Sequence, residues 1–296
     1  MPFICYTNKS FRGETAEIIE AANDIIREYQ AQGFSLTLRQ LYYQFVSRDI
    51  LPNSQKSYKR LGGIVNDGRM AGLIDWEAIE DRTRNVKKNP HWDSPVDILE
   101  SCECQFAYDK WQTQPYAPEV WIEKEALIGV IDGVCRELDV PRFACKGYSS
   151  QSEQWWAGRR FEAALADGRT PIIFHLGDHD PSGIDMTRDN QERLSLFARE
   201  EIRVCRLALN WEQVQKYAPP PNPAKDSDSR FDGYRDQYGD ESWELDALEP
   251  RVIAALIREA IMEIRDEDAW EAALEREAEA KQDLRKARIE MEKKYG

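Results

Sequence analysis

An apolar run that ends in two aspartates constrains the fold of this chain more than any other feature of its sequence. Residues 172–176 read Ile-Ile-Phe-His-Leu, and Asp178, Asp180 and a turn at 181–183 follow directly. Because residues i and i+2 of an extended strand point to the same face, both carboxylates should project together beyond the strand's carboxyl end. Open α/β sheets bind their ligands at that edge. Two close negative charges need a cation, and oxygen ligands favour Mg²⁺, with Mn²⁺ as the alternative.

Part of this stretch also has a simpler interpretation. Residues 180–183 have a favourable type I turn sequence, and Asp180 can cap the following helix without any metal. This interpretation does not account for Asp178, nor for a second acid in a matching place, Glu123 at the end of the apolar stretch 119–123. We therefore predict that Glu123, Asp178 and Asp180 converge on one metal ion.

From residue 119 onward, the chain alternates between strand-like and helix-like patterns. This alternation is typical of a parallel sheet flanked by helices, so we expect an α/β, Rossmann-like domain over residues 119–250. A polar loop that begins with the proline-rich run at 219–223 and reaches about residue 242 is long enough to suggest a functional segment. The expected strands and intervening helices cover residues 119–123, 124–138, 141–146, 150–166, 171–177, 182–199 and 202–209.

Residues 1–100 show helical patterns without this alternation. Three amphipathic helices followed by a hairpin are the outline of a winged-helix domain, whose third helix enters the DNA major groove. We therefore expect a DNA-binding domain in this part of the chain. The expected helices and hairpin cover residues 13–31, 37–48, 58–71 and 73–84.

Two further segments complete the expected organisation. Residues 101–118 should link the two domains, and residues 251–296 should form C-terminal helices. The helix expected at 266–294 is so highly charged that a solvated helix with i,i+4 ion pairs is favoured over a helix that packs against a partner.

Charge is distributed unevenly along the chain. The net charge is −14, whereas residues 36–92 hold 10 Lys or Arg against 6 Asp or Glu. A basic patch on an acidic protein is compatible with nucleic-acid binding, although ordinary surface variation also explains so small an excess. The candidate DNA-binding residues of the third helix and the hairpin are Lys59, Arg60, Arg69, Arg82 and Arg84.

The composition argues against several other classes of protein. No apolar run approaches roughly 18 residues and no secretory pattern opens the chain, so we expect a cytoplasmic protein with no membrane partner. The 6 cysteines do not suggest a disulfide scaffold in a chain of 296 residues. Cys102 and Cys104 are too close together for a zinc motif.

One tyrosine stands apart from the apolar stripe of the second expected helix. At about 100° per residue, Tyr42 lies on the stripe and should be core, whereas Tyr43 lies off its centre with Arg39 one turn before it. A guanidinium beside a tyrosine favours the phenolate and offers a phosphate contact. The simpler interpretation is a half-buried surface tyrosine stacked on an arginine. The stripe consists of Leu38, Leu41, Tyr42, Phe45 and Val46.

These motifs resemble those of one known family, the topoisomerase VI A subunit and the related meiotic double-strand-break transesterases. Residues 39–43 resemble its Arg-x-aliphatic-aromatic-Tyr motif, and residues 122–124 resemble the Glu-Lys at the first strand of its Toprim domain. Residues 177–183 resemble its Asp-x-Asp-Pro-x-Gly. A Lys/Arg-Gly-aromatic-x-Ser turn and a late Glu-Leu-x-Ala-Leu stretch are matched by residues 146–150 and 242–248, in the same order along the chain.

The resemblance spans roughly residues 13–265 and implies a winged-helix domain that carries the tyrosine, followed by a Toprim domain. The chain is shorter than typical A subunits and has no Gly-x-x-x-x-Gly-Lys-Ser/Thr loop of an ATPase. It is most similar to the compact stand-alone A-subunit relatives of phages and mobile elements. ATP-driven strand passage would therefore require a separate ATPase subunit, whereas strand cleavage would not.

The resemblance also implies a chemistry. Tyr43 would attack a phosphodiester of double-stranded DNA, which gives a 5′-phosphotyrosyl enzyme and a free 3′-hydroxyl. Mg²⁺ held by Glu123, Asp178 and Asp180 would neutralise charge at the phosphate. Glu123 would return a proton to the leaving oxygen, and Arg39 would hold the phosphate.

In the family, the tyrosine of one protomer works with the metal site of the other, which implies a homodimer that makes a double-strand break. Lys124 and Lys146 are further candidate DNA contacts. Two other functions fit the same residues. A hydrolytic Toprim nuclease would use water as the nucleophile and leave Tyr43 a structural role. A non-catalytic DNA-binding protein on the same fold would need no metal, although three converging acids count against it.

Overall fold

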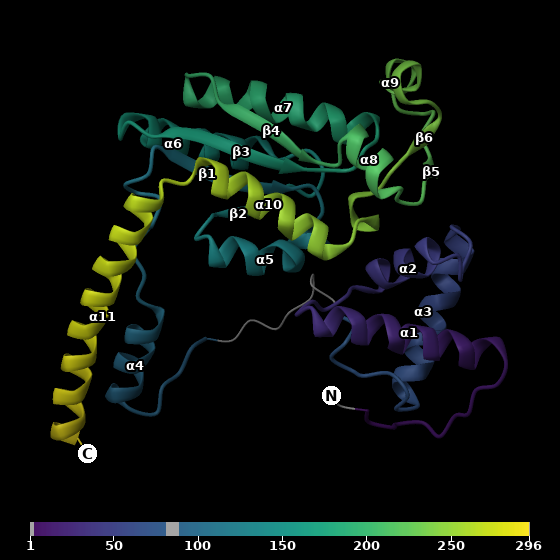
Figure 1. Cartoon of the computed structure of the whole chain (residues 1–296), viewed down its shortest axis with the longest axis horizontal. Helices are drawn as coiled ribbons and strands as arrows, with labels where there is room; N and C mark the ends of the chain where they lie inside the picture. Colours follow the sequence, from purple (N-terminus) through teal and green to yellow (C-terminus); the bar gives the residue numbers. More distant parts are fainter. Residues whose placement is uncertain (1–2, 81–88, 296) are drawn as a thin grey trace.

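The computed structural model describes residues 3–80 and 89–295 (Figure 1). Its centre is a four-stranded parallel sheet with the strand order β2-β1-β3-β4. The predicted α/β class is therefore confirmed. The strands are β1 (Tyr116–Ile122), β2 (Arg142–Ala144), β3 (Thr170–Leu176) and β4 (Arg203–Ala208).

The second strand is shorter than the sequence pattern predicts. It ends at Ala144, although the predicted strand continues to residue 146. The next residues turn out of the sheet, because Lys146 and Gly147 have positive φ angles of 57° and 86°. The turn that resembles the family's Lys/Arg-Gly-aromatic-x-Ser motif therefore begins at the end of this strand.

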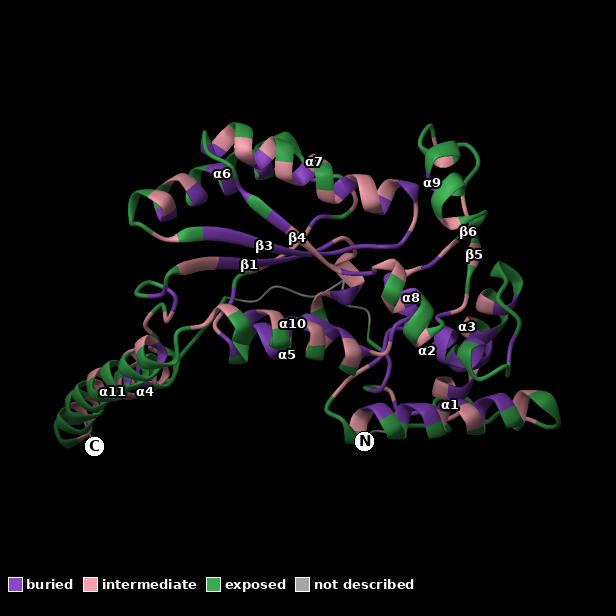
Figure 2. Cartoon of the chain, turned by 45° about the horizontal axis from the view of Figure 1, so that its top comes forward, coloured by how far each residue is buried: buried purple, intermediate pink, exposed green. Residues whose placement is uncertain are grey.

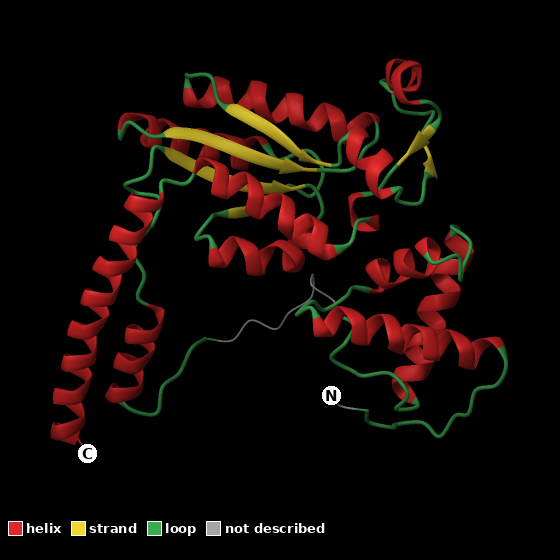
Figure 3. Ribbon diagram, in the orientation of Figure 1, coloured by secondary structure: helices red, strands yellow, loops and turns green. Residues whose placement is uncertain are grey.

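Helices cover both faces of the sheet (Figure 3). Val120 and Ile122 of β1 belong to the core shared with α5 and α10, whereas Trp121 between them belongs to the core shared with α6 and α7. The alternation follows from the two-residue period of a strand. A strand buried on both faces is typical of a parallel sheet. The covering elements are η1 (Glu125–Leu127), α5 (Ile128–Glu137), α6 (Gln151–Ala166), α7 (Pro181–Ala198) and α10 (Pro250–Ile264).

Three N-terminal helices form a further core, and η2 also contributes Ala247 to it. The second of these helices begins at a capping box, in which the side chains of Thr37 and Gln40 each accept from the other's backbone N–H. Over the described residues 73–80, one bridge forms, between Leu36 and Ile79, and the hairpin expected at 73–84 stays a prediction. Residues 81–84 lie outside the described residues. The elements are α1 (Glu14–Ala31), α2 (Leu38–Ser47), α3 (Gln55–Met70) and η2 (Leu245–Ala247).

The predicted loop at 219–242 contains regular structure, so the prediction of a plain loop is wrong. Its two ends pair as an antiparallel hairpin. Backbone hydrogen bonds of 2.8 and 3.0 Å between His179 and Trp243 attach this segment to the end of β3. The sequence pattern misses these elements because each is only a few residues long. They are β5 (Asn222–Pro223), α9 (Phe231–Tyr238) and β6 (Glu241–Ser242), and α8 (Trp211–Tyr217) precedes them.

An arm of two helices, α4 (Pro95–Gln105) and α11 (Glu267–Tyr295), projects from the end of the sheet (Figure 1). Glu103 accepts hydrogen bonds of 2.7 and 2.9 Å from Arg285 and Arg288. Most of α11 is exposed, as its charged sequence predicts (Figure 2). The first residues of the predicted linker therefore belong to a helix. In the described part of the chain, no helix is long and apolar enough to cross a bilayer.

Candidate functional site

The two strand ends that carry the predicted acids lie side by side. Glu123 follows β1, Asp178 and Asp180 follow β3, and these strands are neighbours in the sheet. Glu123 Oε2 accepts a hydrogen bond of 2.9 Å from the backbone N–H of Asp178. A Cβ at Gly177 would lie 2.9 Å from the same Oε2, so glycine permits this close approach.

Asp180 also has the structural role that the turn sequence predicts. Its Oδ1 accepts from the backbone N–H of Gly183 at 2.6 Å and from the hydroxyl of Ser182 at 3.0 Å, and it thereby caps α7. Burial raises the pKa of Glu123, and the negative charge of Asp180 adds to that rise. The two carboxylates therefore interact electrostatically, while one oxygen of Asp180 serves the cap.

A second acidic pair, which sequence reasoning did not select, completes the cluster. Within the described ranges, the three carboxylates whose oxygens all lie within 4.8 Å of one another are Asp178, Glu244 and Asp246. Glu123 and Asp180 lie outside this tighter set. The stretch that holds Glu244 and Asp246 had matched a family motif, and its alternating acids were the available signal.

Lys124 occupies the centre of the tighter set. Its Nζ lies 2.8 Å from Asp178 Oδ1 and 2.9 Å from Asp246 Oδ1, and it also pairs with Glu244. The neighbouring acids raise the pKa of Lys124 against the effect of burial. A half-buried ammonium with three carboxylate partners has a structural role here, which makes Lys124 a poor candidate for a direct DNA contact.

The cluster nevertheless carries more negative than positive charge. Five carboxylates face three cations, so a divalent cation would balance the surplus of two negative charges when all are ionised. Burial, with Glu123, Asp246 and Glu244, raises the pKa of Asp178 to about 7, although Lys124 opposes the rise. The carboxylates of Asp178, Glu244 and Asp246 could hold a metal ion, and carboxylate oxygens are ligands that hard divalent ions prefer. The charged groups are Arg39, Glu123, Lys124, Asp178, Asp180, Arg206, Glu244 and Asp246.

Arg206 of β4 holds the loop that carries the two aspartates. Its guanidinium donates hydrogen bonds to the backbone carbonyls of Gly177, Asp178 and Gly183, at 3.2, 2.5 and 2.7 Å. The only sequence signal for this role is an arginine within an apolar strand. Arg206 therefore fixes the backbone of the site and supplies a positive charge beneath it.

The tyrosine helix docks on the same cluster. Arg39 Nε lies 2.7 Å from Asp246 Oδ2, and its Nη2 lies 2.5 Å from Glu244 Oε2 and 3.5 Å from the Tyr43 hydroxyl. Its guanidinium also lies 5.7 Å from the centre of the Tyr43 ring. The predicted pairing of Arg39 with Tyr43 is therefore present, and two acids of the sheet domain hold Arg39 in place.

Tyr43 itself is more buried than the helical wheel predicts, with 4% of its surface exposed. Its pKa is raised, chiefly by burial and then by Glu244 and Asp246, whereas Arg39 and Asn222 lower it. The predicted preference for the phenolate is therefore wrong in this conformation, because burial outweighs the guanidinium. Tyr43 still borders a polar hollow of about 260 Å³. Its other lining residues include Arg39, Asn53, Ser54, Asn222 and Glu244.

The remaining DNA-binding candidates are exposed residues, one arginine with structural contacts, and two arginines that lie outside the described residues. Lys59 is exposed on α3, and Arg60 next to it pairs with Glu14 at 2.7 Å. Arg69 donates to the carbonyl of Ile79 at 2.8 Å and to that of Trp76, so its contacts favour a structural role. Lys146 is exposed and pairs with Glu125 at 2.8 Å. Arg82 and Arg84 lie outside the described residues.

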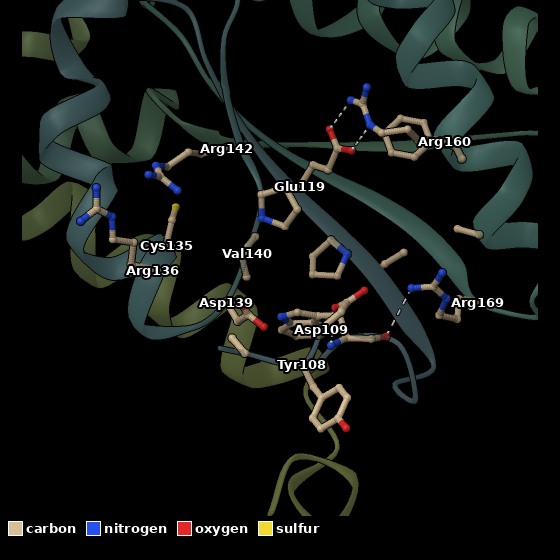
Figure 4. Close-up of a pocket in the computed structure, with 17 residues that line it drawn as sticks. Tyr108, Asp109, Glu119, Cys135, Arg136, Asp139, Val140, Arg142, Arg160 and Arg169 are labelled. Carbon is tan, nitrogen blue, oxygen red and sulfur yellow. Dashed lines mark hydrogen bonds and ion pairs between the residues drawn. The ribbon is translucent and has the colours of Figure 1, made fainter. Parts of the chain in front are cut away.

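A larger hollow of about 540 Å³ lies at the opposite end of the strands from the acids, near the amino end of β1 (Figure 4). Arginines line it, but carboxylates neutralise them: Glu119 accepts two hydrogen bonds of 3.0 Å from Arg160. Arg142 and Arg136 both pair with Asp132. None of the predicted site residues that the structure describes lines this hollow. The acidic edge therefore remains the better candidate for chemistry.

The fold and the site together define an α/β protein with an acidic cluster at the carboxyl ends of its central strands. Comparison with models of known protein families and with curated proteins finds no match to this chain. Its function must therefore be inferred from the geometry of the site.

Proposed function

We propose that this protein cleaves double-stranded DNA by tyrosine transesterification, as a topoisomerase VI A-like enzyme with Tyr43 as nucleophile and Mg²⁺ as cofactor. The observation that carries the proposal is a chain of contacts from the tyrosine to the acids. Tyr43 contacts Arg39, which pairs with Glu244; Lys124 joins Glu244 to Asp178. Residues far apart in the sequence thus form one charged network. In this proposal, α1–α3 belong to a winged-helix domain and the sheet to a Toprim domain.

Glu123, Asp178 and Asp180 would hold the metal, since all three follow neighbouring strands and the surplus negative charge surrounds them. A bound Mg²⁺ would supply charge neutralisation at the phosphate. Mn²⁺ has the same preference for oxygen ligands and should substitute for it. The same ion would compete with Lys124 for Asp178.

The chain's own residues account for the bond changes. The Tyr43 oxygen forms a bond to phosphorus, and the bond from phosphorus to the 3′-oxygen breaks. Glu123, whose pKa is raised by burial, gives a proton to the departing 3′-oxygen, and the phenol proton leaves to solvent. Arg39 would exchange a carboxylate partner for the phosphate that it holds.

The resemblance implies a homodimer, which is part of this proposal. Within one chain, Arg39, Glu244 and Lys124 lie between Tyr43 and Asp178 in the contact network. We therefore propose that Tyr43 acts at the metal site of a second copy, which would place two nucleophiles on opposite strands. Lys59 and Lys146 are exposed and suit phosphate contacts. Strand passage would additionally need a separate ATPase subunit, and DNA as substrate implies a location in the cytoplasm or nucleoid.

One observation favours the hydrolytic alternative. Tyr43 is buried and its pKa is raised, which makes it a poor nucleophile in this conformation. A Toprim nuclease would instead use water at the same carboxylates and leave no protein on the DNA. A non-catalytic DNA-binding protein would keep Lys124 at Asp178 permanently and would bind DNA without cutting it.

Incubation of supercoiled plasmid with the protein and Mg²⁺ tests these functions. The proposal predicts nicked or linear DNA with protein attached to its 5′ ends, and loss of the adduct in Tyr43→Phe and Asp178→Asn. Tyr6→Phe, which alters an exposed tyrosine far from the acids in sequence, should leave the adduct unchanged. Cleavage by Tyr43→Phe without attached protein would replace transesterification by hydrolysis, and intact plasmid with every variant would leave only DNA binding.

A further inference from the structure

Two asparagine side chains join the hairpin β5–β6 to the tyrosine helix. Asn53 lies between α2 and α3, and Asn222 begins β5. Asn53 Nδ2 donates to Asn222 Oδ1 at 3.0 Å and to the backbone carbonyl of Pro221 at 2.9 Å. The Tyr42 hydroxyl lies 3.3 Å from Asn53 Oδ1, to which it can donate. Both amides line the polar hollow beside Tyr43.

These partners determine which way each amide points. The Asn53 atom that faces the Pro221 carbonyl must be the nitrogen, because a carbonyl oxygen only accepts. The same nitrogen faces Asn222, whose atom at that place must then be Oδ1. The Nδ2 of Asn222 is therefore turned the other way.

The Asn222 Nδ2 group is shielded from solvent and unsatisfied. Among the described residues, it has no hydrogen-bond partner of normal geometry. A buried donor without a partner is unfavourable by itself, so this group calls for an acceptor. Tyr43 and Asn222 line the same hollow, and the interaction with Asn222 lowers the pKa of Tyr43.

We propose that Asn222 is a positioning residue for the Tyr43 nucleophile: its amide N–H donates to the phenolate oxygen, and Asn53 holds the amide in that orientation. The inference rests on the proposed function, because it gives Tyr43 the role of nucleophile. A phenol that must ionise while buried needs donors that favour the charged form. Asn222 stabilises the phenolate without introducing a charge that would compete with Arg39 for phosphate.

Other groups that face Tyr43 define what must be held constant in a test. Glu244 and Asp246 raise its pKa from the sheet side, and Arg39 lowers it from the same helix. The ring of Tyr42 lies 5.6 Å away, centre to centre. Variants of Asn222 should leave all four groups in place, since its side chain contacts Asn53.

The test measures the ionisation of residue 43 directly. A fluorinated tyrosine is placed at position 43, and its ¹⁹F resonance is followed against pH in the full chain without DNA. Asn222→Leu removes the donor and should raise the pKa at position 43 by about one unit. At a fixed pH well below that pKa, the phenolate fraction should then be about tenfold smaller. Asn222→Asp, which adds a negative charge in nearly the same volume, should raise the pKa further. Asn53→Ala should cause a smaller rise.

Controls separate this role from a structural one. Asn66→Leu alters an exposed asparagine of α3 and should leave the pKa at position 43 unchanged. Thermal unfolding of each variant identifies those that are misfolded, and Asn222→Asp keeps the size of the side chain. The rate of adduct formation at fixed pH should fall in the same order as the pKa rises.

Equal pKa values in the parent, Asn222→Leu and Asn222→Asp would overturn the inference even if the DNA adduct formed. A parent protein without an adduct would instead overturn the proposed function and leave the pKa order intact.

Discussion

Lys124 Nζ lies 2.8 Å from Asp178 Oδ1. Lys124 directly follows Glu123 at the end of β1, and its charge offsets that of Asp178 at the end of the neighbouring strand β3. Glu244 and Asp246 share the same ammonium, and Asp246 also holds Arg39 of the tyrosine helix. Lys124 therefore connects the predicted metal site to the element that carries Tyr43. Its removal, its replacement by a metal ion and the titration of its partners all have measurable consequences.

Replacement of Lys124 by Met should destabilise the protein by about 3–5 kcal/mol in urea unfolding, because it leaves buried carboxylates without their counter-charge. Added Mg²⁺ should recover more stability in this variant than in the parent, since the surplus of negative charge is larger by one. The matched control is Lys146→Met, which removes an exposed ion pair and should have little effect. Equal responses of both variants to Mg²⁺ would contradict a metal at this cluster.

The stability of the protein should depend on pH through Asp178. Burial raises its pKa from 3.8 to about 7, so the folded state binds the proton more tightly than the unfolded chain does. This contribution is fully present below the unfolded pKa of about 4 and is lost as pH rises to about 7, by up to about 4 kcal/mol. Asp178 should therefore stabilise the folded state less and less across that range.

The Asp178→Asn variant isolates this contribution. An amide cannot ionise, and its oxygen can still accept from the Leu245 backbone N–H, which lies 2.8 Å from Asp178 Oδ1. Between about pH 4 and pH 8, the free energy of unfolding of the variant should rise relative to that of the parent. A difference that is independent of pH would show that Asp178 ionises normally in the folded state.

Replacement of Arg206 by Met should lower stability by about 3 kcal/mol, because several backbone carbonyls lose a charged donor at once. Mg²⁺ should also bind more weakly to the variant, as the loop that carries Asp178 is no longer held. Calorimetric titration with Mg²⁺ and urea unfolding measure the two effects. Arg203→Met alters an exposed arginine of the same strand and should change neither quantity.

Replacement of Asp246 by Asn should release the tyrosine helix. The change weakens the pairing of Arg39 at 2.7 Å and removes one of the charges that raise the pKa of Tyr43. Hydrogen exchange across α2 should become faster, and the pKa at position 43 should fall. Glu241→Gln, which alters an exposed acid nearby in the sequence, provides the control. Unchanged exchange in α2 would show that packing on Ala247 alone docks the helix.

Local sequence patterns predicted the parts of this fold that depend on nearby residues. The strand ending before Asp178 and the helix capped by Asp180 follow from hydrophobic period and turn chemistry. The capping box at Thr37 places α2 within a residue of the predicted start. The pairing of Arg39 with Tyr43 is likewise a matter of helical spacing.

Contacts between distant segments were harder to predict. The roles of Glu244 and Asp246 become visible only when η2 packs against α2 and brings them to Lys124 and Arg39. The short elements between residues 219 and 242 have too few residues to show a period. Asn222 reaches the tyrosine helix only through the hairpin that they form.

The amino-acid sequence by itself determined the parallel sheet and the strand ends at which Glu123, Asp178 and Asp180 stand, because the period of apolar residues and the chemistry of turns act over a few neighbouring positions. Only the tertiary structure decided which charges meet there. Lys124 at the centre of three acids, Arg39 held by two of them and a buried Tyr43 depend on the packing of segments that no local pattern relates to one another. Burial then reverses the expected effect of Arg39, because removal of a phenol from water raises its pKa by more than one nearby guanidinium lowers it.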